Sequence, residues 1–473
     1  MLGQMILKEI RDNCLNARFM AAAAISFGLI IISVIILAGY VGGESRDYQN
    51  RVQAQNDFID HFGHYNRLGW MAVQSCEPSH LQPLVLGIDR EAAQSNFISD
   101  PVPVLLNRLD FVSIVTIIMS LVAILFSYDA ISGEREAGVL RQLLATGVSR
   151  RTILLGKYWG GLISLVVPFT VSVLAGMVFL AFNPVIILQT VDFEAFGILL
   201  AASWLYIAVF FGIGIFFSAT SQTSDRSILK SLFAWVTLVL VIPNVSPFLA
   251  AQLYPIPSAA KIHQEKWMIT DQERDEIVRK RTRELFDTKF ADLRDIRGLS
   301  QQQIADKLKT DPAMNERYRQ FSTESEQLIK DINREQTAKA QKIGAEFESR
   351  SSAQENLAGI LTSISPYADF VFIATDLAET GIEADNRWAR QAGEYSSALW
   401  QFGEARYRKE LERNPTHSSN DYLDLKDRPR FQFHPAGLMD RMGQGLPQWG
   451  ILVAFSVLLF VGALAMFQRY DVR

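Results

Sequence analysis

The residues that could bind a metal ion are few and fall in one stretch of the sequence. His61 and His64 are three residues apart and would share one face of a helix, while Cys76 and His80 are four apart. Together they could supply nitrogen and sulfur ligands for zinc or copper. Scattered histidines are commonplace on a polar helix, so the pattern favours a structural role. Cys14 is the one further cysteine, which excludes a disulfide framework and any CxxC pair.

Motifs for catalysis are absent from the sequence. There is no HExxH for a zinc protease and no GxSxG elbow for a serine hydrolase. Glu136 and Arg141 are spaced wrongly for a glutamate-rich intramembrane protease. Gly156-Lys157 has no upstream glycine and is followed by Tyr158, so it is no phosphate-binding loop. We therefore predict no catalytic residue in this chain.

The segment 129–157 concentrates charges and leucines. Ser132 can start a helix, which Gly147 can end, and acidic side chains in the first turn suit the helix dipole. Three leucines give this helix a short apolar face, and a second basic stretch leads into the next apolar run. We predict a compact helical hairpin, although composition alone fits a basic interfacial helix that merely sets topology. The residues that carry the pattern are Glu134, Glu136, Gly138, Leu140, Arg141, Leu143, Leu144, Arg150, Arg151 and Lys157.

The elements around this segment are apolar runs long enough to cross a bilayer. About 20 apolar residues span roughly 30 Å of hydrocarbon. Core helices of soluble proteins are shorter and amphipathic, so repeated uncharged runs favour membrane spans. The first is too long for a cleavable signal peptide. Six runs qualify: Phe19–Tyr40, Phe111–Tyr128, Tyr158–Phe182, Phe196–Ser218, Ser231–Leu253 and Trp449–Phe467.

Overall composition agrees with a chain divided between apolar and polar blocks. Hydrophobic residues make up 49% of the 473 residues and charged residues 20%, with a mean hydropathy of +0.11. The net charge of −4 gives no sign of nucleic-acid binding. Lys and Arg gather in 1–18, in 129–157 and after the sixth run, whereas the short loop 183–194 has none. By the positive-inside rule, both termini are predicted to be cytoplasmic.

Two longer segments then lie outside the cytoplasm, 41–110 and 254–448. The second carries several helix signals, including a capping pair at Ser300 and Gln303 and proline after Asp311 and Ser365. We read it as a large, mostly helical extracytoplasmic domain whose charged helices are solvated. The predicted fold class is an all-α integral membrane protein with six transmembrane helices.

The segment 129–157 resembles the cytoplasmic coupling loop of ABC-2 type transporter permeases. That pattern has an acidic pair, a glycine, leucines, Ser-Arg and Gly-Lys, matched here by Glu134 to Lys157 with Ser149 and Gly156. Val139 replaces a common threonine. The stretch 1–18 resembles the family's amphipathic connecting helix before span one. The insertions after spans one and five, with His61–Tyr65 and Ser365-Pro366, resemble a branch that includes gliding-motility and copper-delivery permeases of nitrous-oxide reductase maturation.

This resemblance implies that the chain itself catalyses no reaction. Energy would come from a separate ABC ATPase subunit that binds ATP and magnesium, with no cofactor in this chain. Other implied partners are a second permease copy or a paralogue, the lipid bilayer of the bacterial inner membrane, and an extracytoplasmic protein. The expected activity is ATP-driven transport, with export favoured. The alternative is a transducer that passes ATP-driven motion to the outside without moving cargo.

Overall fold

The computed structural model describes residues 2–65, 68–71, 75–87, 109–145, 147–296, 301–413 and 421–469. Within these ranges the regular elements are helices, apart from one isolated antiparallel bridge between His64 and Tyr422. The predicted all-α fold is confirmed. Contacts divide the chain into two units, unit 1 with Met1–Asn244 and Thr362–Arg473, and unit 2 with Val245–Leu361.

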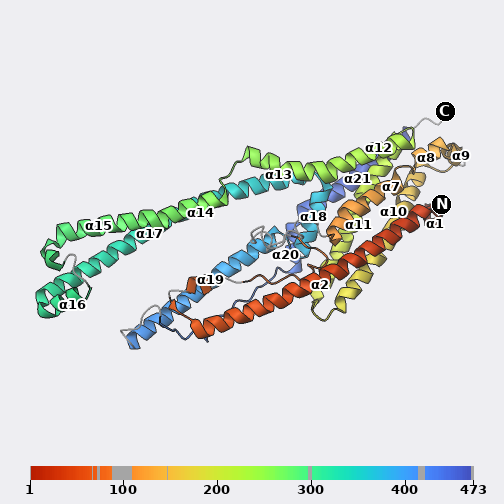
Figure 1. Cartoon of the computed structure of the whole chain (residues 1–473). Helices are drawn as coiled ribbons and strands as arrows, with labels where there is room; N and C mark the ends of the chain where they lie inside the picture. The colour runs from red at the N-terminus through yellow and green to blue at the C-terminus, as the bar shows by residue number, and fades with distance from the viewer. Residues whose placement is uncertain are drawn as a thin grey trace. The chain divides into compact units, whose positions relative to one another are not determined.

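Unit 1 contains the apolar helices (Figure 1). The boundary between the units falls inside α13. The helices, with π-helical stretches written η2 and η3, are α1 (Leu2–Cys14), α2 (Ala17–Phe62), α3 (Leu68–Met71), α6 (Phe111–Ser113), η2 (Ile114–Met119), α7 (Ser120–Ser127), α8 (Ser132–Glu136), α9 (Val139–Ala145), α10 (Arg150–Ala181), α11 (Thr190–Thr220), α12 (Ser224–Trp235), η3 (Val236–Val241), α13 (Ile242–Leu253), α18 (Pro366–Leu377), α19 (Ile382–Arg413), α20 (Leu438–Gln444) and α21 (Leu446–Gln468).

Six helices of the described chain are long and apolar enough to cross a membrane, as the sequence predicts. They are Phe19–Phe62, Phe111–Glu136, Arg150–Ala181, Thr190–Thr220, Ser224–Leu253 and Leu446–Gln468. Large apolar side chains on them remain exposed, for example Ile36, Val171 and Leu458. In water such a surface would be unfavourable, whereas lipid solvates it.

Helix α11 is the centre of the bundle. Its buried aromatic side chains include Tyr206, Phe210 and Phe211, and it packs against α7, α12, α18 and α21. Gly161 of α10 admits the Phe211 ring, since a Cβ there would lie 2.5 Å from the ring. The Tyr206 hydroxyl donates to the carbonyl of Thr116 in η2 at 3.0 Å.

Helix α2 continues well beyond the predicted end of the first span at Tyr40. The segment after Gly43 is charged, yet it keeps helical geometry to Phe62. Its distal part runs beside α19 away from the bundle (Figure 1). Ile59 joins Tyr395, Leu399 and Leu425 in a separate buried cluster, which gives this polar extension a core of its own.

The segment 254–448 is not one domain, in contrast to our prediction. Residues 254–361 belong to unit 2, but α18 is apolar and packs against α11 and α21 in unit 1. Phe370 and Tyr206 have ring centroids 5.0 Å apart. The Ser365 hydroxyl donates to the carbonyl of Leu238 in η3. Burial of the apolar side chains of α18 against α11 and α21 thus stabilises its packing on the spans.

Unit 2 is a set of charged helices around long α17. Its elements after α13 are α14 (Ala259–Trp267), the π-helical stretch η4 (Met268–Glu273), α15 (Arg274–Lys289), the 3₁₀ helix η5 (Ala291–Ile296), α16 (Gln301–Thr310) and α17 (Pro312–Thr362). At a rise of 1.5 Å per residue, the 51 residues of α17 span about 76 Å. Phe290, Leu293 and Ile296 form a small buried cluster. The Arg317 guanidinium lies 4.7 Å from the Phe290 ring centroid and donates to Asp292.

Candidate functional site

The segment 129–157 forms two short helices, α8 and α9, and not the single helix predicted from Ser132 to Gly147. Gly138 adopts φ of +72°, a conformation that suits glycine and ends α8. Gly147, with φ of +79°, ends the turn after α9. Ser149 then caps α10 by accepting the backbone N–H of Thr152 at 3.1 Å. The hairpin is therefore segmented by its glycines.

A buried lysine connects this segment to the first helix of the chain. The Lys157 ammonium lies 2.7 Å from Glu134 Oε1 and 3.3 Å from Glu9 Oε1. Only 5% of the Lys157 side chain is exposed. A buried charge is tolerated when it is paired, so Glu134 and Glu9 together hold α8, α10 and α1 in one ion cluster.

Glu136 reaches the beginning of another span. Its carboxylate accepts the backbone N–H of Ser224 at 3.1 Å and the Ser224 hydroxyl at 2.8 Å. Ser224 is the first residue of α12, where backbone N–H groups lack helical partners. The Glu136 carboxylate on α8 is therefore the hydrogen-bond acceptor for the first residue of the fifth span.

Two arginines bind carbonyl groups at the C-terminal ends of spans. Arg135 donates to the carbonyls of Ser221 at 2.6 Å and Ala219 at 3.3 Å, at the end of α11. Arg150 donates to the carbonyls of Phe467 at 3.1 Å and Gln468 at 2.7 Å, at the end of α21. Cations at helix C-termini complement the dipole and satisfy free carbonyls. Residues 129–157 thus contact the ends of the fourth, fifth and sixth spans as well as α10.

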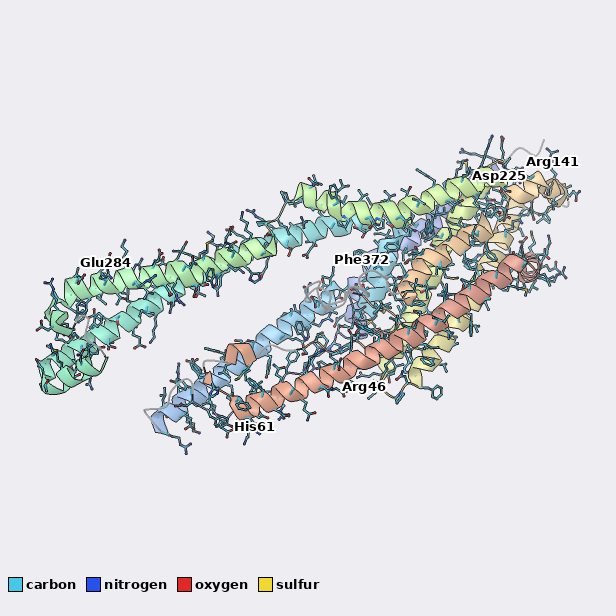
Figure 2. All side chains as sticks on the ribbon, in the orientation of Figure 1. Arg46, His61, Arg141, Asp225, Glu284 and Phe372 are labelled. Atoms are coloured by element: carbon cyan, nitrogen blue, oxygen red, sulfur yellow. The ribbon has the colours of Figure 1, made fainter. Side chains whose placement is uncertain are left out.

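The apolar face of α9 points into this chain. Leu140 is 1% exposed and belongs to the main core, with Leu143 and Leu144 half-buried against it. Leu140 is therefore not available to insert into a partner protein. Arg141 and Arg151 are exposed; Figure 2 shows Arg141 at the same end of unit 1 as Asp225 and far from His61. The outward face of α9 consists of Val139, Arg141, Gln142 and Ala145.

Helix α1 lies against α10 at closely spaced glycines. A Cβ at Gly156 would stand 2.9 Å from Met5 Cβ, and one at Gly160 only 2.6 Å from Glu9 Cβ. Asn13 adds a 3.5 Å hydrogen bond to Ser164. The Gly-Lys pair of the sequence pattern thus has two structural roles, close approach for Gly156 and ion pairing for Lys157.

The four candidate metal ligands do not form a site. No group of three or more His, Cys, Asp or Glu side chains suited to a metal occurs among the described residues. His61 contacts its own helix through the Asp57 carbonyl at 2.8 Å, and Cys76 contacts the carbonyl of Glu77. His64 takes part in the bridge to Tyr422.

His80 has a different partner. Its Nδ1 lies 2.9 Å from Asp192 Oδ2 in the first turn of α11. This hydrogen bond raises the pKa of His80 above its ordinary value. The contact between His80 and Asp192 therefore ties the first insertion to the start of the fourth span.

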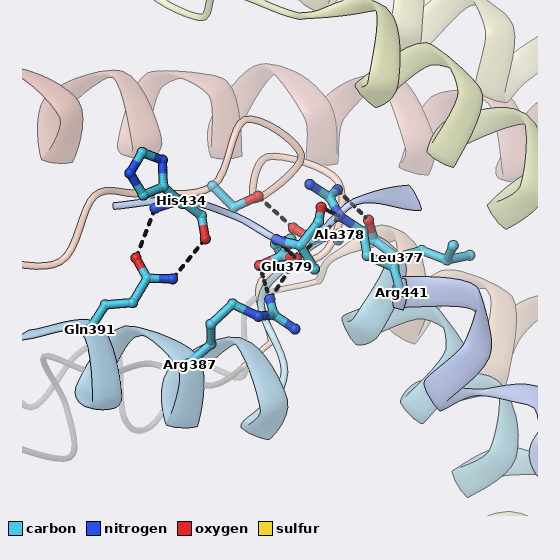
Figure 3. A network of polar contacts seen from close by, with 9 residues as sticks. Leu377, Ala378, Glu379, Arg387, Gln391, His434 and Arg441 are labelled. Carbon is cyan, nitrogen blue, oxygen red and sulfur yellow. Dashed lines mark hydrogen bonds and ion pairs between the residues drawn. The ribbon is translucent and has the colours of Figure 1, made fainter. Parts of the chain in front are cut away.

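A second polar network lies at the turn between α18 and α19 (Figure 3). Glu379 has φ of +57° and is buried; its carboxylate accepts Arg387 at 2.8 Å and the backbone N–H of Ala436 at 3.0 Å. Arg441 lies 3.1 Å from the same carboxylate and donates to the Leu377 carbonyl. Ser79 donates to the carbonyl of Ala378. The turn joins the first insertion, α19 and the segment before α21.

Sequence reasoning missed several partners of this site. Glu9, Arg135 and Ser224 carry contacts of the segment 129–157, and none forms part of the pattern singled out from the sequence. Arg135 lies between the two predicted glutamates, so its position was available as a signal. Glu9 and Ser224 are distant in sequence, and only folding brings them to Lys157 and Glu136.

The six spans and the helical hairpin at their ends define a multi-pass membrane protein. The family model for ABC-2 family transporter protein matches residues 6–472, so the chain belongs to the ABC-2 transporter family. Two relatives carry the name probable ABC transporter permease protein NosY. The protein from Pseudomonas aeruginosa is 32% identical over 151 residues, which is 32% of this chain and 53% of the relative.

The second relative, from Stutzerimonas stutzeri, is 34% identical over 134 residues, 27% of this chain and 47% of the relative. The chain thus spans about half the length of the curated relatives it matches. The predicted family is confirmed.

Proposed function

We propose that this chain is the membrane permease subunit of an ABC transporter of the bacterial inner membrane, and that α8 and α9 receive motion from a separate ATPase subunit. The observation that carries the proposal is the set of polar contacts from residues 129–157 to four spans. The ion cluster at Lys157 holds α10 and α1, and Arg135, Glu136 and Arg150 hold the ends of α11, α12 and α21.

These contacts provide a mechanical route. A push on the outward face of α9 would displace α8, because the two short helices are joined at Gly138 and contact each other directly. Displacing α8 would pull on the end of α11 and the start of α12, because both are hydrogen-bonded to α8. Packed elements with discrete arrangements respond to such loads as rigid bodies. The partner needs only to bind the outward face, where Arg141 supplies charge and Val139 an apolar contact.

In this proposal, ATP hydrolysis is carried out by the partner subunit. The ATPase subunit binds ATP and magnesium, and this chain contributes no cofactor. A second permease copy or a paralogue would complete a two-fold assembly, the usual symmetry of small oligomers. Export of a substrate to the extracytoplasmic side is the activity that we favour.

The test compares outward and inward variants of the same segment. Val139→Asp combined with Arg141→Glu should lower co-purification of the ATPase subunit about tenfold or more, since it reverses a charge and removes an apolar contact at the docking face. Glu136→Gln should leave association intact but lower the permease-stimulated ATPase rate, since it weakens the bond to Ser224. Both quantities are measured on complexes purified in detergent.

Arg319→Glu is the matched control, an exposed charge reversal on α17 of unit 2. It should change neither quantity. If the outward double variant retains wild-type association and wild-type stimulation, then α9 is not the docking face and the proposal fails.

A transducer that moves no cargo is the second candidate. Unit 2 favours it, because residues 245–361 form a separate helical unit that a purely transporting bundle does not require. The two functions are distinguished by reconstitution in vesicles with the ATPase subunit. ATP-dependent movement of candidate cargo supports transport. Coupled ATP hydrolysis together with an ATP-dependent change in unit 2, and no movement of cargo, supports transduction.

A further inference from the structure

Unit 2 contains an open groove between α15, η5, α16 and α17. Its volume is about 560 Å³, and its floor is apolar and largely aromatic, with Phe286, Ile296, Ile304, Tyr318 and Phe321. The Phe286 and Phe321 rings meet edge to face with centroids 5.3 Å apart. Such a contact fixes the rings and gives the groove a firm base.

The border of the groove is basic. Arg279 and Arg283 are exposed and stand one helical turn apart on α15. Between them, the hydroxyl oxygen of Thr282 is buried without a hydrogen-bond partner. The described residues that line the groove include no aspartate or glutamate. A buried hydroxyl with no partner among the described residues, beside two cations, favours a ligand that brings hydrogen-bond acceptors.

We propose that this groove docks an amphipathic helical segment of a partner protein, with apolar anchors on the aromatic floor and a carboxylate at Arg279 and Arg283. An open apolar groove accepts a helix by its anchors at i, i+3 and i+4. Guanidinium groups pair with carboxylates in strong, directional hydrogen bonds. The charge of the border therefore selects an acidic helix and rejects a basic one. This inference does not depend on the α9 face binding an ATPase.

The experiment uses the full chain in nanodiscs and fluorescence anisotropy. The probes are two fluorescein-labelled model helices with the same leucine face, one flanked by glutamates and one by lysines. The acidic helix should bind the wild type, and Arg279→Glu with Arg283→Glu should raise its Kd about tenfold or more, as loss of charge-assisted bonds implies. The same double variant should gain affinity for the lysine helix. Higher salt should weaken the wild-type complex.

Lys280→Glu with Arg281→Glu is the control, because it makes the same change in net charge on α15 outside the groove lining. It should leave both Kd values unchanged, and circular dichroism melts check that each variant is folded. Equal binding of the acidic helix to the wild type and the groove variant overturns the proposal, as does no binding above empty nanodiscs. Displacement of the helix by cis-parinaric acid in an Arg283-dependent manner would assign the groove to a free amphiphile and also overturn it.

Discussion

At the residue scale, the polar centres of unit 1 are buried charges with more than one partner. Lys157 has two carboxylates, and Glu379 has two arginines and a backbone N–H. Removing one member of such a group leaves the others desolvated and unpaired, which costs about 3–5 kcal/mol. Glu379 carries an added strain, since φ of +57° disfavours a residue with a Cβ.

Substitutions at Glu379 separate these two effects. Glu379→Gln should lower the free energy of unfolding by about 3 kcal/mol, because Arg387 and Arg441 lose their charge partner. Glu379→Gly loses the same carboxylate but relieves the backbone, so it should be about 1 kcal/mol less destabilising. The measurement is thermal unfolding in detergent with Arg390→Gln, an exposed change on α19, as the reference. Equal stability of Glu379→Gln and the wild type would show that the network is unimportant.

At the element scale, the first helix depends on glycines in its neighbour. Gly160 leaves room for the backbone of α1, since its Cβ position lies 3.2 Å from the Ile6 carbonyl. Gly197 in α11 has nothing within 4 Å of its Cβ position. The two glycines therefore differ in what a larger side chain would meet.

Gly160→Leu should displace α1 from α10, because overpacking of this kind costs about 1–3 kcal/mol and α1 can yield. Amide hydrogen exchange in residues 2–14 should accelerate about tenfold, while exchange in α11 stays unchanged. Gly197→Leu should leave exchange in α1 at the wild-type rate. Slow exchange of α1 in both variants would contradict the assigned packing.

At the scale of the whole molecule, the orientation in the membrane remains a prediction from charge. Cys14 ends α1 and is exposed, whereas Cys76 is half-buried in the first insertion. These two residues report on opposite sides of the bilayer if the termini are cytoplasmic.

A membrane-impermeant maleimide applied to intact cells should label the Cys14→Ser variant through Cys76 and leave the Cys76→Ser variant unlabelled. Thr323→Cys in a cysteine-free background tests the same side without the partial burial of Cys76, since Thr323 is exposed on α17. It should be labelled strongly. Labelling of Cys14 in intact cells, with none at position 323, would reverse the orientation.

The sequence by itself determined the six spans, because length and absence of charge are local properties that the bilayer selects directly. It also located the hairpin at 129–157, since glycines and helix signals act over a few residues. Only the tertiary structure decided which way those side chains face. Leu140 fills the core of this chain, and Glu134 and Glu136 satisfy Lys157 and Ser224, whose positions depend on packing across more than one helix. The tertiary structure also decided the division of 254–448 between two units. The apolar side chains of α18 become buried only by packing against α11 and α21, which are distant in sequence.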